Sequence, residues 1–148
     1  VSGTAWGSVV LDETLLQFLK GVRNALFNED FDTLSQFCVL PLVVYSAAGV
    51  ATIKDHEELK SVADRYRQVL SAYPITHGDC RIVQRDPPVN QRCRVTARWN
   101  EYSADNTLQT SSLVRYFLIE IKPGDWLIEM LEYLEMAVSI EDAERILH

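Results

Sequence analysis

Arg115 and Glu132 are the residues whose types and spacing could most directly supply chemistry. Arg115 lies in the apolar stretch 111–121, and Glu132 lies in the next one, 126–135. If the two stretches pair as antiparallel strands, both side chains lie opposite each other between apolar layers. They are then expected to form an ion pair, because an unpaired buried charge is costly. Arg115 would orient a ligand carbonyl or carboxylate, and Glu132 would be the candidate acid or base. A structural ion pair at the rim is the alternative.

A second group of side chains is expected to line the same site. Glu101 joins the charged cluster if its strand stays regular to its end. Tyr45 and Tyr66 could donate hydrogen bonds to a ligand, although a buried tyrosine usually finds a partner within the protein. The expected ligand-binding residues are Tyr45, Tyr66, Trp99, Glu101, Phe117 and Met130. Ordinary core packing is the alternative for the two aromatic rings and the methionine among them.

Three adjacent strands are predicted to position these residues: 91–102, 111–121 and 126–135. In the first, apolar residues alternate with Arg, Thr and Asn, which is the period of a half-buried strand. The tetrapeptide 122–125, Lys-Pro-Gly-Asp, is a tight turn. The predicted register sets Arg115 opposite Glu132 and Trp99 opposite Leu113, because the apolar residues then share one face of the sheet.

The other elements follow from apolar periodicity, capping residues and turn residues. They are a loose arm at 1–8, a helix at 11–27, a short helix after Asp30, strands at 42–45 and 50–53, a long helix after Asp55, a strand at 79–85 and a terminal helix after Ser139. The whole chain, 1–148, is expected to be a single domain with a core of about 10–137 and a C-terminal helix at 139–147.

The other face of the predicted sheet is too apolar for a solvated surface. It carries Val114, Tyr116, Leu118, Leu131 and Tyr133. We expect a homodimer that packs through this outer face with two-fold symmetry. A different protein covering the same surface is the alternative.

Composition narrows the classes of partner. The net charge is −7, which argues against general binding to nucleic acid or to anionic membranes. No apolar run is long enough for a spanning helix, and no signal peptide is visible, although a leader removed before Val1 stays open. Three cysteines without metal-like spacing indicate free thiols and a cytoplasmic location. The histidines also lack ligand spacing, so neither a metal site nor a dissociable cofactor is expected.

Two stretches make the chain similar to a known family. In 31–59, a short helix runs through Pro41 into a Val-Val-Tyr strand, a Gly turn and a capped helix. The segment 116–128 reads Tyr-Phe-Leu-Ile-Glu-Ile-Lys-Pro-Gly-Asp-Trp-Leu-Ile. Together they resemble the nuclear transport factor 2-like superfamily, in its SnoaL-like or ketosteroid-isomerase-like branch, over roughly 10–137.

The resemblance implies a cone-shaped α+β fold, also called cystatin-like. A curved antiparallel or mixed sheet would wrap around N-terminal helices and leave a pocket at the open end of the cone. Members of the superfamily include ketosteroid isomerases, polyketide cyclases, dehydratases, scaffold subunits of ring-hydroxylating dioxygenases and non-enzymatic binding proteins. Many of them are homodimers through the outer face of the sheet.

The chain departs from the isomerase pattern at each position that the resemblance places. The base Asp expected at the end of the first strand falls in Val-Tyr-Ser-Ala at 44–47, which has no carboxylate. The expected tyrosine of the first helix falls near Val22, and the expected acid falls around 116–117. The cyclases and dehydratases use histidine and acidic residues; His77 could approach the pocket mouth, but no His–Asp pair can be assigned.

The sequence therefore leads to two hypotheses of different kinds. In the first, the protein binds a small hydrophobic carbonyl or ring ligand in the pocket, and isomerase, cyclase or dehydratase chemistry is compatible with such a site. In the second, it is a non-catalytic scaffold or interaction module that works through the outer face of the sheet. A cone filled by its own side chains would favour the second hypothesis.

Overall fold

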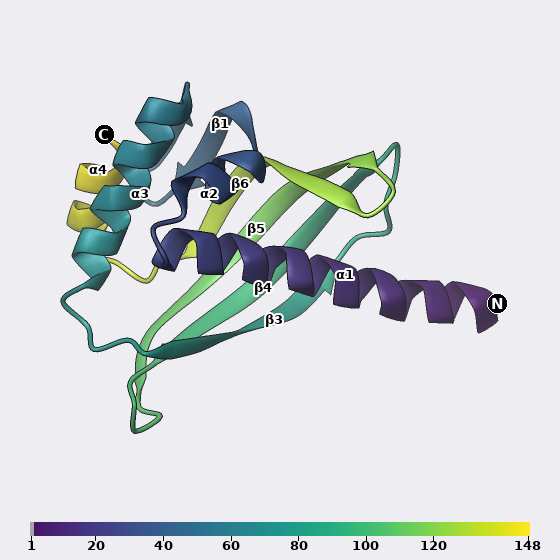
Figure 1. The fold of residues 1–148 in the computed structure, drawn as a ribbon, viewed down its shortest axis with the longest axis horizontal. Coiled ribbons are helices and arrows are strands. Elements are labelled where there is room, and N and C mark those ends of the chain that lie inside the picture. Colours follow the sequence, from purple (N-terminus) through teal and green to yellow (C-terminus); the bar gives the residue numbers. More distant parts are fainter. Residues whose placement is uncertain (1) are drawn as a thin grey trace.

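The computed structural model describes the backbone of residues 2–148 and the side chains of residues 9–148. This part of the chain forms, in order, α1 (Ser2–Phe27), α2 (Phe31–Gln36), β1 (Cys38–Ser46), β2 (Gly49–Ile53), α3 (His56–Leu70), β3 (His77–Arg85), β4 (Arg92–Tyr102), β5 (Leu108–Lys122), β6 (Asp125–Glu135) and α4 (Ile140–Leu147). Figure 1 shows α1 lying across a curved sheet, with α3 and α4 side by side at one end. The predicted α+β architecture is confirmed.

The strands form one mixed sheet in the order β2-β1-β6-β5-β4-β3. The β1–β6 pair is parallel, and the other neighbouring pairs are antiparallel. The turn between β5 and β6 has Gly124 at φ 85°, a conformation that glycine adopts without a steric penalty. Within residues 2–148, no helix has both the length and the apolar composition that a membrane crossing requires.

The first helix is longer than predicted. It begins at Ser2, so the loose arm expected at 1–8 is wrong for residues 2–8, whereas Val1 lies outside the described residues. No proline precedes Pro41 in the sequence, so no residue before it lacks the backbone N–H that helical hydrogen bonds use, and the helix can begin as early as Ser2. Its apolar stripe is the predicted one: Leu15 and Leu19 are fully buried, and burying one such side chain contributes about 1.5–3 kcal/mol.

Helix starts are fixed by the capping residues that the sequence suggested. The Asp55 carboxylate accepts a hydrogen bond from the Glu58 amide at 2.9 Å, and the Glu58 carboxylate accepts one from the Lys54 amide at 3.0 Å. The side chains of Asp30 and Ser139 likewise accept from the Thr33 and Asp142 amides at the starts of α2 and α4. Each cap satisfies an amide that has no partner within its own helix.

The register between β4 and β5 differs from the prediction by one residue. Trp99 lies opposite Ser112, not Leu113, and Ala97 lies opposite Val114. Because side chains alternate along a strand, a shift of one residue turns every β5 side chain to the other face. We call the face of the sheet that packs against the helices the inner face. It carries Val114, Tyr116 and Leu118, all buried, rather than Arg115 and its neighbours.

The β5–β6 register is confirmed where Arg115 faces Glu132 and Phe117 faces Met130. A bulge next to this point changes the alternation, because Leu118 then pairs with Ile128. The surface predicted to mediate a homodimer is therefore wrong in its residues, since Val114, Tyr116, Leu118, Leu131 and Tyr133 pack into the core. The homodimer itself stays a prediction.

Candidate functional site

A cavity of about 160 Å³ lies between the helices and the inner face of the sheet. Its walls are mainly apolar, and α1, α3 and five of the strands contribute to them. Representative residues are Val22 and Leu26 of α1, Val44 of β1, Leu59 of α3, Val114 of β5 and Ile128 of β6. The apolar faces of these elements pack against one another, and the space that they leave unfilled is the cavity.

The C-terminal segment forms one wall of this cavity. Met136 and Val138 of the connection after β6, and Ile146 and Leu147 of α4, are among its lining residues. The Arg65 guanidinium of α3 holds α4 in place by donating to the Ile146 carbonyl from Nε at 2.9 Å and from Nη2 at 2.7 Å. The short helix α4 thus closes one side of the cavity. Its apolar residues and the two hydrogen bonds from Arg65 hold it there.

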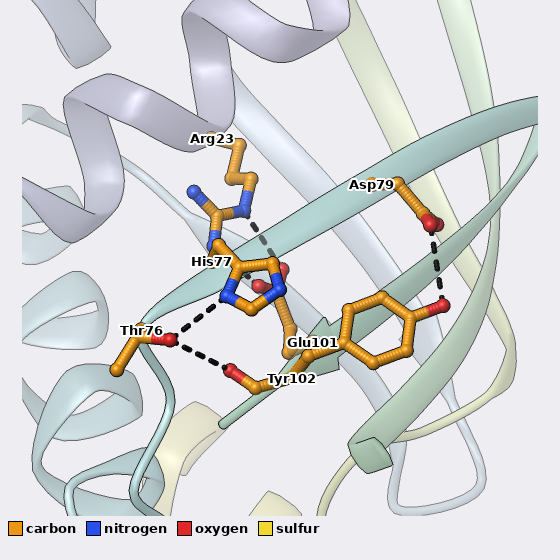
Figure 2. Close-up of polar contacts among 6 residues, drawn as sticks. All are labelled: Arg23, Thr76, His77, Asp79, Glu101 and Tyr102. Atoms are coloured by element: carbon orange, nitrogen blue, oxygen red, sulfur yellow. Dashed lines mark hydrogen bonds and ion pairs between the residues drawn. The ribbon is translucent and has the colours of Figure 1, made fainter. Parts of the chain in front are cut away.

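A buried ion pair forms one polar part of the cavity wall. Arg23 of α1 donates from Nε to Oε1 of Glu101 at 2.8 Å and from Nη2 to Oε2 of the same carboxylate. The guanidinium also lies over the Phe27 ring, 4.4 Å from its centroid. Figure 2 shows Arg23 reaching from α1 to Glu101 on β4. Glu101 is only 5% exposed, so the pair is largely withdrawn from water.

Gly78 on β3 provides the space for this carboxylate. It pairs with Glu101 in the β3–β4 ladder. A Cβ at position 78 would overlap the Glu101 carboxylate, lying 2.5 Å from its Cδ. The absence of a side chain at Gly78 is thus what allows Glu101 to lie along the strand and reach Arg23.

Three tyrosines form the second polar part of the wall: Tyr66, Tyr116 and Tyr133. Burial raises the pKa of the Tyr133 hydroxyl to about 12. Burial is also the main cause that raises the pKa of Tyr66, and the nearby Tyr133 and Glu101 raise it further. The pKa of Tyr116 is raised for the same main reason. All three groups therefore stay protonated, as neutral hydrogen-bond donors, at neutral pH.

The hydroxyls differ in their hydrogen bonding. The Tyr116 oxygen accepts a bond from Nε1 of Trp99 at 2.8 Å, which leaves the Tyr116 proton to be donated elsewhere. In the part of the chain that the structure describes, the hydroxyls of Tyr66 and Tyr133 have no hydrogen-bond partner. Both side chains lie deep in the molecule yet keep some exposed surface, as residues that face an internal cavity do.

The structure brings together three of the residues predicted to bind a ligand. Tyr66, Trp99 and Glu101 line the cavity. The predicted ion pair between Arg115 and Glu132 forms, with Nη1 of Arg115 2.7 Å from Oε1 of Glu132. Its predicted place on the inner face is wrong, because the register shift puts the pair on the outer face. The other three residues of the prediction, Tyr45, Phe117 and Met130, also do not line the cavity.

His77 is held in a surface network. Its Nδ1 lies 2.8 Å from the Thr76 hydroxyl, and its Nε2 lies 2.8 Å from the Asn106 side-chain oxygen. Its ring lies beside that of Tyr102, with the ring centroids 5.6 Å apart and the planes 24° from parallel. Figure 2 shows the two side chains next to each other. Both ring nitrogens are therefore occupied outside the cavity. Among the described residues, no group of three or more His, Cys, Asp and Glu side chains could hold a metal ion.

The sequence prediction missed Arg23, Tyr116 and Tyr133 as cavity residues. The signal for Arg23 was available: it lies four residues after Leu19 and three before Leu26, on the apolar stripe of α1. A charged residue in that position needs a buried partner. The two tyrosines were predicted to lie on the outer face, and the register shift explains both errors.

Comparisons with solved structures identify the fold of this chain. No protein-family model matches the chain, and no curated protein matches its sequence. Among solved structures, ActVI-ORFA from Streptomyces coelicolor is similar with a TM-score of 0.62 and 14% identity, over 88% of this chain and 98% of that one. A nuclear transport factor 2-like protein of unknown function from Shewanella oneidensis MR-1 is similar with a TM-score of 0.57 and 18% identity, over 82% and 96% of the two chains.

A third similar structure is a nuclear transport factor 2-like superfamily protein from Salmonella enterica. Its TM-score is 0.55 at 9% identity, and the match covers 89% of this chain and 95% of that one. At identities this low, the shared feature is the path of the backbone, and function has to be argued from the site itself. The chain has the nuclear transport factor 2-like fold, also described as cystatin-like.

Proposed function

We propose that this protein binds a small hydrophobic molecule that carries a carbonyl or hydroxyl oxygen, and that the cavity between the helices and the sheet is the binding site. The ring or chain of the ligand would contact the apolar walls. The oxygen would accept hydrogen bonds from the Tyr66 and Tyr133 hydroxyls. Such a division, with mainly apolar contacts and a few placed polar groups, is typical of small-molecule sites.

The observation that carries this proposal is the pair of unpartnered tyrosine hydroxyls in an apolar cavity. Neither hydroxyl oxygen is among the fully buried, unpartnered side-chain atoms of the described residues, so water in the cavity can hydrogen-bond to both until a ligand binds. A ligand oxygen that accepts from both hydroxyls would displace that water. Because both phenols stay protonated at neutral pH, they can act there as donors.

The size of the cavity limits the ligand. Apolar cavities of similar volume accept single-ring molecules such as benzene. A single aromatic ring with one carbonyl group, as in acetophenone, is therefore a suitable probe. Hydrogen bonds to a carbonyl oxygen also stabilise the negative charge that an enolate would place there. Isomerase, cyclase or dehydratase chemistry on a carbonyl compound would use the same contacts.

Titration calorimetry with acetophenone tests the proposal. Tyr133→Phe removes one donor from the cavity and should weaken binding roughly two- to tenfold, the value of one hydrogen bond. Tyr45→Phe is the matched control, because Tyr45 is 41% exposed and does not line the cavity. If acetophenone did not bind the wild-type protein, or if both substitutions weakened binding equally, the proposal would be wrong.

A further inference from the structure

The charge of the cavity depends on one ion pair. Of the described residues that line the cavity, Arg23 and Glu101 are the charged ones, and they neutralise each other through two N–H···O contacts. The remaining polar contributions come from neutral hydroxyl groups such as those of Tyr66 and Tyr133. As folded, the cavity offers hydrogen-bond donors but no net positive charge.

The Arg23 guanidinium is held in place independently of the carboxylate. It packs on the face of Phe27, and its stem starts from the apolar stripe of α1. A guanidinium has five N–H donors, and the pair with Glu101 uses two of them. If the carboxylate lost its charge, an unneutralised cation would remain in the cavity wall.

We propose that Glu101 determines the charge of the ligand: by neutralising Arg23, it restricts the cavity to uncharged molecules and excludes carboxylates of the same size. This inference rests on the proposed function, because it concerns ligand choice at the same site. A carboxylate entering the cavity would lose its hydration, and Arg23, the cation among the described lining residues, is already paired with another carboxylate. A ketone of the same shape gives up far less hydration.

Gly78 is a positioning residue in this scheme. It leaves the space in which the Glu101 carboxylate lies beside β3, as the overlap with a Cβ at position 78 indicates. Selection against anions thus depends on three positions from three elements: Arg23 on α1, Gly78 on β3 and Glu101 on β4.

The test compares acetophenone with benzoate, which has a similar shape but carries a negative charge at neutral pH. The wild-type protein should bind acetophenone at least about tenfold more tightly than benzoate. Glu101→Gln keeps the shape of the side chain and removes its charge. Its affinity for benzoate should rise by at least about tenfold, because the freed guanidinium forms charge-assisted hydrogen bonds. Adding Arg23→Gln to this variant should abolish the gain.

Glu132→Gln is the matched control for the substitution. It also removes the acidic partner of an arginine, but that pair lies on the outer face and outside the cavity. Its benzoate affinity should equal that of the wild type. Circular dichroism and thermal unfolding check that each variant is folded. The comparison of acetophenone with benzoate on the wild-type protein does not depend on any variant.

The outcomes separate this inference from the proposed function. Acetophenone binding together with equally tight benzoate binding to the wild type would overturn the role of Glu101 and leave the cavity as a binding site. The role of Glu101 would also be overturned if a folded Glu101→Gln variant gained no affinity for benzoate. It would be overturned as well if Glu132→Gln gained as much benzoate affinity as Glu101→Gln. Absence of acetophenone binding to the wild type would instead overturn the proposed function.

Discussion

Arg23 and Glu101 form a bidentate ion pair although 78 positions separate them in the sequence. The contact joins the C-terminal half of α1 to the end of β4, next to the cavity. It is largely buried, with the two side chains 18% and 7% exposed. Removing one partner of such a pair leaves an uncompensated charge, so the contact matters more for structure than an exposed pair does.

Gly78→Ala should destabilise the protein by about 1–3 kcal/mol, because the added methyl group overlaps the Glu101 carboxylate. Gly21→Ala is the matched control. A Cβ at position 21 would lie 3.6 Å from the Phe37 ring, an ordinary contact, and alanine favours the interior of a helix by roughly 0.5–1 kcal/mol. Chemical denaturation of both variants measures the difference. Equal stability of the two would contradict the close packing of Glu101 on Gly78.

Much of this fold was predictable from the sequence, and the reason is local. Asp30, Asp55 and Ser139 act on amides within the next three residues, so their capping roles can be seen in short segments. The alternation of apolar and polar residues in β4 likewise identified its buried face, including Val95 and Ala97.

The orientation of β5 could not be predicted in the same way. Both of its faces are apolar: Val114 and Leu118 point inward, and Leu113 and Phe117 point outward. With two equally apolar faces, periodicity does not select the register. The register is set by contacts between strands, which the pattern of a single strand does not contain. Arg115 was consequently placed inside the cone, and the cavity residues Tyr116 and Tyr133 were placed outside.

Stability should fall at alkaline pH, because the phenols that are buried in the folded protein ionise more readily in the unfolded chain. The pKa of Tyr133 is raised from 10.0 to about 12, and those of Tyr66 and Tyr116 are raised too. A group with a raised pKa in the folded state contributes its full stability below its unfolded pKa and loses it as the pH rises through its folded value. Denaturation midpoints should therefore drop between about pH 10 and pH 12. The double variant Tyr66→Phe, Tyr133→Phe should show a smaller drop, and an unchanged pH profile would contradict this prediction.

The cysteines should be unreactive in the native protein. Burial raises the pKa values of the Cys38 and Cys80 thiols to about 12, and that of Cys93 is raised as well. The thiolate is the reacting species, so its fraction at about pH 8 is very small. Dithiodipyridine should label the unfolded chain rapidly and the folded protein slowly. Cys38 lines the cavity, so its rapid labelling in the folded protein would show that the cavity opens far more readily than its packing suggests.

Arg65→Ala should release α4 from the body of the protein. The substitution removes both hydrogen bonds to the Ile146 carbonyl, and bonds to a charged group contribute about 1.5–3 kcal/mol. Amide hydrogen exchange in 140–148 should accelerate while that of β4 and β5 stays slow. Arg145→Ala is the control, because the Arg145 side chain is 74% exposed and pairs within α4 itself. Equal exchange in both variants would mean that Arg65 does not anchor the helix.

A crystal structure of the acetophenone complex tests the central claim most directly, because it locates the ligand and the hydrogen bonds that hold it. The account predicts that the ring fills the cavity against Leu59 and Val114. The carbonyl oxygen should lie about 2.6–3.0 Å from the hydroxyl of Tyr66 or Tyr133. Ligand density on the outer face of the sheet, or a cavity closed by its own side chains, would contradict it.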